Sequence, residues 1–262
     1  MSAITGAALI TGASGRLGRA MALELARMGH DVLIHHNASA ADAETVAAEA
    51  RALGVRAAVL QADLLDRGEV AGLVPAAVAA IGPLSVLINN ASIFEYDNLR
   101  SATPESWDRH LGSNLYAPVF LTQAFAAQVP GGATDNAGER IATAAVINMI
   151  DQRVRNLTPE FATYTIAKFG LWGFTQTAAQ GLAPDIRVNA IGPGPTLKGA
   201  RQSEEHFSKQ RAATILERGA NPDDITAALR FILTSQSVTG QLLCIDGGQH
   251  LAWQTPDVLG VE

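Results

Sequence analysis

The apolar positions of the chain follow two patterns that alternate from one end to the other. Short runs rich in apolar and β-branched residues are followed by longer, alanine-rich stretches in which apolar residues recur at helical spacing. Strands that alternate with helices in this way are typical of βαβ units, which build a parallel sheet. The pattern therefore predicts an α/β fold with seven strands. These strands are expected at residues 7–10, 32–34, 57–60, 86–89, 144–149, 187–191 and 242–245.

Residues with strong backbone preferences mark where the helices begin and end. Gly29 and Gly54 follow the first two predicted helices, at residues 16–28 and 40–53, where a left-handed residue is favoured. A capping residue followed by proline predicts the start of a helix, because proline suits the first helical position. Three pairs have this form: Thr103-Pro104, Thr158-Pro159 and Asn221-Pro222.

The chain shows no break in composition and no internal repeat, so one domain is predicted over residues 1–262. A cluster of Gly, Asn and Asp between residues 129 and 140 indicates an exposed loop. A further loop after residue 192 leads into a polar helical stretch, and together they predict a substrate flap at about residues 192–217. His206 and Phe207 lie in this flap and are candidates for its inner wall, with a solvated helix as the default alternative.

Composition and charge exclude several classes of function. The 19 Lys and Arg residues against 25 Asp and Glu give a net charge of −6, so no global positive field would hold nucleic acid or an anionic membrane. The uncharged stretch 71–94 is interrupted by Pro75 and Pro83, as a helix followed by a strand requires, and predicts no transmembrane segment. No basic residue precedes Arg16, so we do not expect a secretory signal, and we expect a cytoplasmic protein. The single cysteine, Cys244, is expected to be a buried small hydrophobe.

The turn after the first strand has the composition of a phosphate-binding site. It runs from Thr11 to Gly18 and opens the first helix. Backbone N–H groups at a helix N-terminus bind anions, and small residues let a pyrophosphate approach the main chain. An ordinary glycine-rich turn is the alternative, but the strand before it and the helix after it favour a dinucleotide. Arg16 adds a cation beside the turn.

The end of the second strand bears on which dinucleotide is bound. A site selective for NAD usually has Asp or Glu about twenty residues after the turn, whereas this chain has His35, His36, Asn37 and Ser39 in that region. Without a carboxylate to repel a 2′-phosphate, and with Arg16 nearby, the sequence favours NADP(H) over NADH. The alternative is that the histidines simply form a polar strand end, since neutral histidine binds phosphate weakly.

Two predicted elements carry candidate catalytic side chains. Tyr164 and Lys168 lie one helical turn apart, so the phenol and the ammonium project from one face. A fixed cation is expected to lower the pKa of the phenol from about 10 toward neutral pH, which would make it a usable proton donor or acceptor. Asp151 ends a predicted strand, and ligands bind at the carboxyl ends of parallel strands. A loop carboxylate or a helix-cap residue is an equal alternative for Asp151.

Four motifs occur in the order and spacing of the short-chain dehydrogenase/reductases. They are Thr11-Gly12 to Gly18, Asn89-Asn90-Ala91-Ser92, Tyr164 to Lys168, and Gly192-Pro193-Gly194-Pro195-Thr196. The sequence resembles this family over nearly its whole length. The resemblance implies a single-domain Rossmann fold, with a doubly wound seven-stranded parallel sheet and helices on both faces. It also implies an NAD(P)-dependent oxidoreductase that assembles as a homotetramer.

The resemblance assigns roles to individual residues. Tyr164 would be the catalytic acid/base, Lys168 would grip the nicotinamide ribose and lower the tyrosine pKa, and Asn114 would hold a proton-relay water. Asp63 is expected at the adenine and Thr196 near the carboxamide. The full expected set of cofactor contacts is Gly12, Ser14, Arg16, Leu17, His35, His36, Asn37, Ser39, Asp63, Leu64, Asn90, Ala91, Ser92, Tyr164, Lys168, Pro193, Gly194 and Thr196.

Departures from the broad family resemble the pteridine reductases and the bacterial dihydromonapterin reductases. Arg16 and Ser92 stand where the usual motifs have glycine, and Asp151 stands where the family has its catalytic serine. In that subgroup Arg16 and Ser92 would touch cofactor phosphate and substrate, Phe94 would stack on a pterin, and Asp151 would support proton delivery. The expected substrate contacts are Arg16, Ser92, Phe94, Asp151 and Tyr164. Ala38 differs from the subgroup, which carries an arginine there for the 2′-phosphate.

The chemistry of Asp151 points in the same direction. An ionised carboxylate cannot donate a hydrogen bond to a ketone oxygen and repels the negative charge that develops there, so simple ketones are disfavoured. A pterin instead offers C=N bonds and an amino-pyrimidine edge with N–H donors. Phe94 suits a flat heteroaromatic ring, with a buried core phenylalanine as the alternative.

Three functional hypotheses follow. The first is an NADP(H)-dependent reductase that delivers hydride to a C=N bond of a pterin, a small-molecule substrate. The second keeps the fold and cofactor but acts on another carbonyl or imine, because fold does not fix function. The third, from another class, is a non-catalytic dinucleotide-binding redox sensor, against which Tyr164 and Lys168 together argue. The histidines lack metal-ligand spacing with the cysteine, so no metal is predicted.

Overall fold

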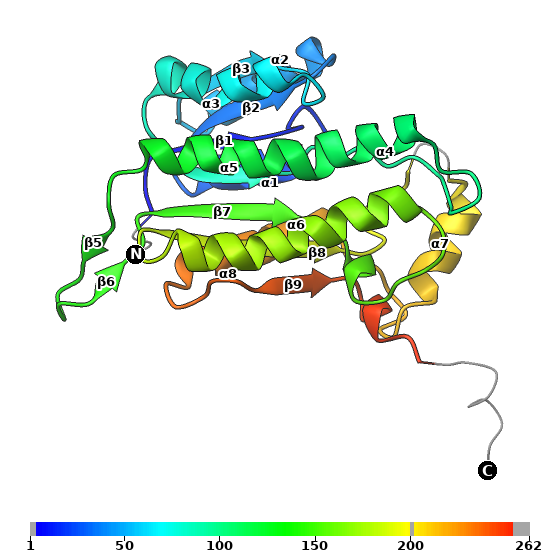
Figure 1. Cartoon of the computed structure of the whole chain (residues 1–262). Helices are drawn as coiled ribbons and strands as arrows, with labels where there is room; N and C mark the ends of the chain where they lie inside the picture. The colour runs from blue at the N-terminus through cyan, green and yellow to red at the C-terminus, as the bar shows by residue number, and fades with distance from the viewer. Residues whose placement is uncertain (1–3, 200–201, 254–262) are drawn as a thin grey trace.

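A seven-stranded parallel sheet forms the centre of the molecule (Figure 1). The computed structural model describes residues 4–199 and 202–253; the other parts of the predicted 1–262 domain, residues 1–3, 200–201 and 254–262, lie outside this description. The strand order is β3-β2-β1-β4-β7-β8-β9, so the order reverses between β1 and β4. The strands are β1 (Ala7–Ile10), β2 (Asp31–His36), β3 (Ala57–Gln61), β4 (Leu84–Asn89), β7 (Ala144–Met149), β8 (Ile186–Pro193) and β9 (Leu242–Ile245).

Helices cover both faces of the sheet, as predicted (Figure 1). One apolar core lies between the sheet and α1, α2 and α8, and a second lies between the sheet and α3, α5 and α6. The buried strands are apolar on both sides because each face meets a helix layer. The helices are α1 (Arg16–Arg27), α2 (Ala40–Ala52), α3 (Arg67–Ile81), α4 (Pro104–Leu111), α5 (Ala117–Gln128), α6 (Ala162–Gly181), α7 (Glu204–Ala212) and α8 (Pro222–Thr234).

Most of the predicted helix ends are confirmed. Gly29 and Gly54 have φ of 88° and 93°, in the left-handed region that glycine adopts without steric cost. Thr103 and Asn221 form capping boxes before the prolines that open α4 and α8. These caps fix where the chain leaves the sheet edge and enters each helix.

The prediction that Thr158-Pro159 opens a helix is wrong. Helix α6 begins at Ala162, and its N-cap residue, Phe161, has a left-handed φ of 56°. The Thr158 hydroxyl is hydrogen-bonded to the Arg153 guanidinium, so it does not cap backbone N–H groups. The N–H of Phe161 instead donates to the Asp97 carbonyl at 2.7 Å, which ties the start of α6 to the segment after β4.

Two further expectations need correction. The exposed loop predicted at 129–140 contains a short antiparallel pair, β5 (Ala133–Thr134) and β6 (Arg140–Ile141), which extends from the body of the molecule (Figure 1). Cys244 is only partly buried, because β9 is the last strand of the sheet and has a neighbouring strand on one side alone. Burial nonetheless raises the pKa of the Cys244 thiol to about 11, so the thiol is protonated at neutral pH.

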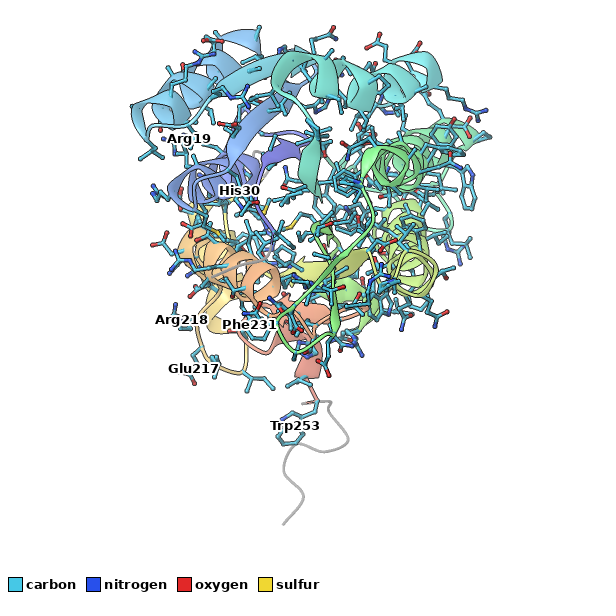
Figure 2. The ribbon with its side chains drawn as sticks, turned by 90° about the vertical axis from the view of Figure 1, so that its left-hand side faces the viewer. Arg19, His30, Glu217, Arg218, Phe231 and Trp253 are labelled. Carbon is cyan, nitrogen blue, oxygen red and sulfur yellow. The ribbon has the colours of Figure 1, made fainter. Side chains whose placement is uncertain are left out.

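The predicted flap forms an extended loop followed by α7, which buries none of its side chains in the described part of the chain. Glu217 and Arg218 follow it and point outward beside Phe231 of α8 (Figure 2). Among residues 4–199 and 202–253, no helix is long and apolar enough to cross a membrane. The same described residues contain no cluster of three or more His, Cys, Asp or Glu side chains arranged for a metal ion.

Candidate active site

The turn between β1 and α1 is built so that backbone, not side chains, faces its neighbours. Gly12 has φ of 61°, and a Cβ there would lie 3.0 Å from the Ala91 Cα. A Cβ on Gly18 would lie 2.2 Å from the Gly12 carbonyl oxygen, closer than any side chain tolerates. Arg16 adopts a left-handed φ of 53° at the position where the family pattern has glycine. The glycines therefore let α1 start directly against the strand ends.

Polar contacts from β4 hold this turn in place. The Asn90 amide donates to the carbonyls of Thr11 and Gly12 at 2.8 and 3.1 Å. The Thr11 hydroxyl in turn accepts from the backbone N–H groups of Asn90 and Ala91 at 2.9 and 3.0 Å. The first and second motifs of the sequence are thus one interlocked unit at the point where the strand order reverses.

His35 supports the same turn from the end of β2. Its Nδ1 accepts from the Gly12 N–H at 3.0 Å, so its Nε2 carries the proton and donates to the Ala62 carbonyl at 3.0 Å. Burial lowers the pKa of His35 to about 4, which keeps the ring neutral at physiological pH. Both ring nitrogens are hydrogen-bonded inside the protein, so neither is free to bind a ligand. We therefore expect His35 to position the turn and not to hydrogen-bond the cofactor through its ring nitrogens.

A cavity of about 580 Å³ opens beside the turn. It suits a dinucleotide, because the turn and the first residues of α1 line it, and a helix N-terminus presents backbone N–H groups that bind phosphate. His36 is buried and, with Ser39, lies outside the lining of this cavity. The expected cofactor residues that line it are Gly12, Ser14, Arg16, Leu17, His35, Asn37, Asp63, Leu64, Asn90, Ala91 and Ser92.

A second cavity, of about 900 Å³, continues from the first toward the flap. Arg16, Leu17 and Ser92 line both, so the two spaces form one cleft across the carboxyl ends of the strands. The guanidinium of Arg16 donates to the carbonyls of Leu197 and Lys198 at 3.1 and 2.9 Å, which links the phosphate turn to the flap. The other predicted residues that line the second cavity are Phe94, Asp151, Pro193, Gly194, Thr196, His206 and Phe207.

Asp151 lines the second cavity, and Tyr164, which is buried and does not line it, is hydrogen-bonded to Asp151. The Tyr164 hydroxyl donates to Asp151 Oδ2 at 3.0 Å, and the Arg153 N–H donates to Oδ1 at 2.8 Å. Burial raises the pKa of the Asp151 carboxyl. Asp151 is also the N-cap of a short helical turn. Both alternatives from the sequence therefore hold, because one carboxylate oxygen caps the turn and the other accepts from Tyr164.

The expected effect of Lys168 on the tyrosine is wrong in this arrangement. Burial and the neighbouring Asp151 raise the pKa of Tyr164 well above its usual value. Lys168 lies with Nζ 5.7 Å from the centre of the Tyr164 ring and donates to the Met149 carbonyl at 2.8 Å. Burial lowers the pKa of Lys168 to about 8, against the opposing pull of Asp151. Burial, followed by Asp151, therefore sets the direction of the shift at the phenol.

Asn114 is completely buried, and its amide is used on the backbone after β4. Its Oδ1 accepts from the Ile93 N–H at 2.9 Å, and its Nδ2 donates to the Ile93 carbonyl at 2.8 Å. The π-helical segment Gly112–Tyr116 between α4 and α5 presents it there. This pairing holds the strand end that carries Ser92 and Phe94, while the relay role stays a prediction.

A buried polar chain fixes the start of α6 beside Tyr164. The Glu95 N–H donates to His110 Nε2 at 3.1 Å, so His110 Nδ1 carries a proton and donates to the Thr163 hydroxyl at 2.7 Å. Thr163 donates in turn to Asp97, which also accepts from Ser106. Although burial acts to raise it, these hydrogen bonds lower the pKa of the Asp97 carboxyl.

Comparisons with known proteins identify the family. A family model described as "Enoyl-(Acyl carrier protein) reductase" matches residues 12–250. The chain belongs to the short-chain dehydrogenase/reductase family. It is 30% identical over 253 residues to the 3-oxoacyl-[acyl-carrier-protein] reductase FabG of Staphylococcus aureus, covering 95% of this chain and 99% of that one.

Solved structures of this family match over almost the whole chain. FolM alternative dihydrofolate reductase 1 from Brucella suis, in complex with NADP, has a TM-score of 0.90 and 41% identity, covering 98% of this chain and 100% of that one. A short-chain dehydrogenase from Burkholderia cenocepacia, also with NADP, has a TM-score of 0.84 and 31% identity, covering 94% of this chain and 98% of that one. These matches confirm the expected resemblance, the Rossmann fold and the oxidoreductase class.

Within this short-chain oxidoreductase, two residues that line the cleft, Phe161 and Arg153, and one behind it, Arg211, were not predicted from the sequence. Phe161 stacks on Phe94 with ring centres 4.3 Å apart, and the guanidinium of Arg153 lies 5.2 Å from the Phe161 ring. Arg211 reaches back from α7 to Pro195. A left-handed phenylalanine has no sequence signal, whereas Arg153 could have been found from its place beside Asp151.

Phe94 is not a core residue. Phe94 is 46% exposed, and the centres of its ring and the Tyr164 ring lie 4.7 Å apart in an edge-to-face arrangement. An exposed aromatic ring on the cavity wall beside the phenol is the arrangement expected for stacking on a flat ligand.

Proposed function

We propose that this oxidoreductase is an NADPH-dependent pterin reductase that reduces a C=N bond of a dihydropterin or a related oxidised pterin. The proposal rests on one arrangement: Asp151 and the exposed ring of Phe94 line one cavity, and the buried Tyr164 contacts both of them. NADPH, when bound, supplies the hydride. The chain's own residues bind, orient and protonate.

The first cavity supports NADP(H). Its phosphate end consists of backbone N–H groups and Arg16 beside the start of α1. At the end of β2 the exposed positions are Asn37, Ala38 and Ser39, so no carboxylate there opposes a 2′-phosphate. The NADP named in the two solved relatives agrees with this. Tyr164, Lys168 and Thr196 are proposed to face the nicotinamide end.

Proton delivery is proposed to pass through Tyr164. Its raised pKa keeps the phenol protonated at neutral pH, so it acts as a donor rather than as a base. Asp151 accepts its hydrogen bond at 3.0 Å and lines the second cavity, so after the phenol has given up its proton, Asp151 can take a proton from solvent and pass it to the phenolate. Lys168, anchored on Met149, supplies positive charge beneath the pair while it is protonated.

The cavity wall supports a pterin as the substrate. Phe94 offers an aromatic face, and Asp151 offers a carboxylate that accepts from ring N–H groups or stabilises a protonated ring. A solved relative of 41% identity is named FolM alternative dihydrofolate reductase 1, and a pterin substrate is supported by that name because dihydrofolate contains a dihydropterin ring. Arg16 and Ser92 are proposed to touch both cofactor and substrate because they line both cavities.

The deciding experiment is a steady-state panel of dihydrobiopterin, dihydromonapterin, dihydrofolate, 3-oxoacyl thioesters and simple ketones, each with NADPH and NADH. Turnover of a pterin with NADPH is expected. Turnover of ketones or oxoacyl thioesters alone would replace the pterin with a carbonyl substrate.

That second candidate is favoured by one finding, the 30% identity to the oxoacyl reductase over nearly the full length. Turnover of any member of the panel would exclude the redox-sensor alternative.

Tyr164→Phe tests the proton donor. The variant keeps the ring and its contacts but removes the transferred proton, so turnover should fall about 100-fold or more while NADPH binding is retained. Tyr116→Phe is the matched control, because Tyr116 packs on Phe120 away from both cavities. Near-normal turnover by Tyr164→Phe would remove the phenol from the mechanism.

A homotetramer in the cytoplasm is part of the proposal. Exposed apolar side chains support assembly: Phe120 on α5, Ile166 and Phe169 on α6, Phe231 on α8 and Leu251. Aromatic and aliphatic residues exposed together mark interfaces more often than free surface. Light scattering on the purified protein should give about four times the chain mass of 27.4 kDa.

A further inference from the structure

The flap has little packing of its own to hold it in place. Helix α7 (Glu204–Ala212) buries no side chain, and its ion pair between Lys209 and Glu205 is about three-quarters exposed at both ends. Exposed ion pairs of this kind contribute little, and a helix without a buried apolar stripe has no packing energy to fix its position. The position of the flap must therefore depend on a few contacts at its ends.

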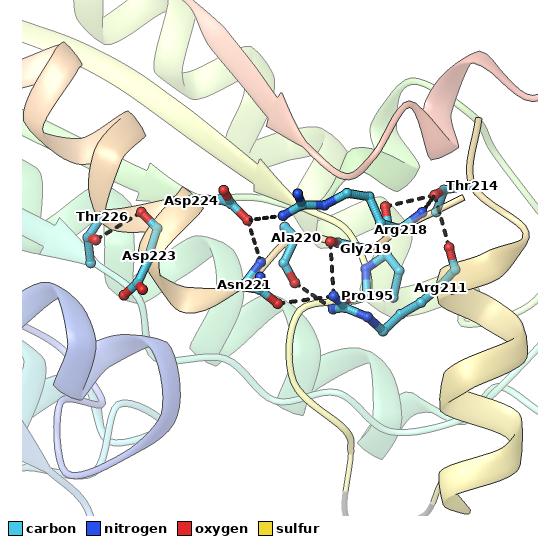
Figure 3. A network of polar contacts seen from close by, with 10 residues as sticks. All are labelled: Pro195, Arg211, Thr214, Arg218, Gly219, Ala220, Asn221, Asp223, Asp224 and Thr226. Carbon is cyan, nitrogen blue, oxygen red and sulfur yellow. Dashed lines mark hydrogen bonds and ion pairs between the residues drawn. The ribbon is translucent and has the colours of Figure 1, made fainter. Parts of the chain in front are cut away.

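Arg211, in the last turn of α7, supplies those contacts (Figure 3). Its guanidinium donates to the carbonyls of Pro195, Gly219 and Ala220 at 2.8, 3.1 and 2.6 Å, and to the Asn221 side-chain oxygen at 3.0 Å. Pro195 precedes the main part of the flap, and residues 219–221 follow it. One side chain from within the flap thus closes the base of the flap on both sides.

The two segments that Arg211 joins also touch each other directly. A Cβ on Gly219 would lie only 2.3 Å from the Pro195 carbonyl oxygen, so the close approach requires glycine. Thr214, which is buried, bonds through its hydroxyl to the Arg211 and Arg218 carbonyls at 3.0 and 2.8 Å (Figure 3). The two ends of the flap are therefore packed closely against each other in one fixed arrangement.

Pro195 leads into the cavity wall. Thr196 is buried, and its hydroxyl donates to the Gly194 carbonyl at 3.1 Å. Pro195 and Thr196 line the second cavity together with His206 and Phe207 of α7. A change in the position of the base would therefore move both the strand end and the helix that face the reacting groups.

We propose that Arg211 is a positioning residue that sets the place of Pro195 and Thr196 at the nicotinamide end of the cofactor site and holds α7 over the substrate cavity. This inference rests on the proposed function, which places residues 193–196 at the nicotinamide. It requires the planar guanidinium, because four acceptors around one side chain need several donors in fixed directions, and a lysine ammonium does not supply that geometry. Removing the guanidinium leaves three carbonyls to find other donors.

The first measurement uses the protein without cofactor. A glutamate-specific protease has targets at Glu204 and Glu205 in α7, and variants at residue 211 leave these targets unchanged. Arg211→Gln and Arg211→Lys are expected to speed cleavage there about tenfold, because proteolysis follows the population in which the segment is open. Arg218→Gln is the matched control: it removes the same charge nearby, but that side chain makes a single long hydrogen bond, to Asp224 at 3.4 Å, within the described residues, and the variant should be cleaved like wild type.

The second measurement uses NADPH and the best substrate of the panel. Arg211→Gln and Arg211→Lys should weaken the Kd for NADPH and raise the substrate KM about tenfold each, with kcat changed less than about threefold, as expected when positioning is lost and the reacting groups stay. Gly219→Ala, which keeps Arg211 but displaces Pro195, should show the same split. The Arg218→Gln control should bind and turn over like wild type.

Wild-type cleavage, NADPH Kd and KM in Arg211→Lys would overturn the inference, as would faster cleavage with unchanged NADPH binding. If Arg211→Gln does not fold by circular dichroism, Arg211→Lys and Gly219→Ala decide between these outcomes. A failure of the proposed function gives a different result: the wild-type protein would then fail to bind NADPH or to reduce a pterin. The cleavage rates of the cofactor-free variants would still show whether the contacts of Arg211 hold the flap.

Discussion

His35 connects the stability of the fold to pH through the phosphate-binding turn. The ring is 2% exposed and neutral, with Nδ1 accepting from Gly12 and Nε2 donating to Ala62. A proton on Nδ1 would convert that acceptor into a donor facing another N–H group. Burial accordingly lowers the pKa from its ordinary 6.5 to about 4. His35→Gln removes this titration, and the difference between wild type and variant isolates it.

The magnitude follows from the two pKa values. Between pH 6.5 and 4 the unfolded chain binds a proton at residue 35 that the folded chain does not, so stability rises with pH in this window. The contribution is fully present above pH 6.5 and is lost as pH falls. Between pH 7.5 and pH 5 the loss amounts to about 2 kcal/mol, and its limit below pH 4 is about 3 kcal/mol.

The assay is urea unfolding followed by tryptophan fluorescence at pH 7.5 and pH 5, for wild type and for His35→Gln. At pH 7.5 the variant should be less stable by about 1–3 kcal/mol, because the Gly12 N–H loses its partner. At pH 5 that gap should narrow by about 2 kcal/mol. The buried His30, whose pKa burial also lowers, is present in both proteins and cancels. A gap that stays constant between the two pH values would refute the reasoning.

Three other outcomes are expected. Burial lowers the pKa of Lys168 to about 8, so kcat/KM should fall as pH rises through about 8, and Lys168→Arg should move this alkaline limb upward; an unmoved limb would assign it to another group. Gly18→Ala should destabilise the protein by about 1–3 kcal/mol in thermal unfolding, because its Cβ would meet the Gly12 carbonyl at 2.2 Å. Gly15→Ala, whose Cβ meets nothing within 4 Å, is the control and should match wild type. Asp151→Ser should shift kcat/KM from pterins toward ketones, and an unchanged substrate profile would make the carboxylate structural.

The sheet and most helix ends could be predicted because their signals are local. Apolar runs buried on both faces, and caps such as Thr103, depend on residues only a few positions apart. The start of α6 could not be predicted in this way. Thr158 has the sequence of a cap, but its hydroxyl bonds to Arg153, and the N–H of Phe161 bonds to Asp97, far away in the chain. Tertiary contacts outweighed the local preference there.

The candidate site divides in the same way. Sequence spacing brought Tyr164, Lys168 and Asp151 together correctly, since strand ends and a helical turn fix their places. The direction of the pKa shift of the Tyr164 phenol was not predicted correctly, because it depends on burial and on the neighbouring Asp151. The contacts of Arg211 could not be predicted either, because its four acceptors lie on Pro195 and on residues 219–221, which are far apart in the sequence.

The electrostatic balance of the cleft bears on the choice of substrate. Tyr164 and Lys168 are buried and Asp151 is half-buried, and burial opposes the charged form of each: it lowers the pKa of the lysine and raises those of the two acids. A developing oxyanion beside Asp151 would add a negative charge where one is already costly. A C=N nitrogen, unlike a ketone oxygen, is basic enough to be protonated before hydride arrives, so hydride transfer to the protonated ring removes a positive charge and forms no anion on the substrate beside Asp151. On the proposed function, the same burial that keeps Tyr164 protonated therefore favours a C=N bond over a simple ketone.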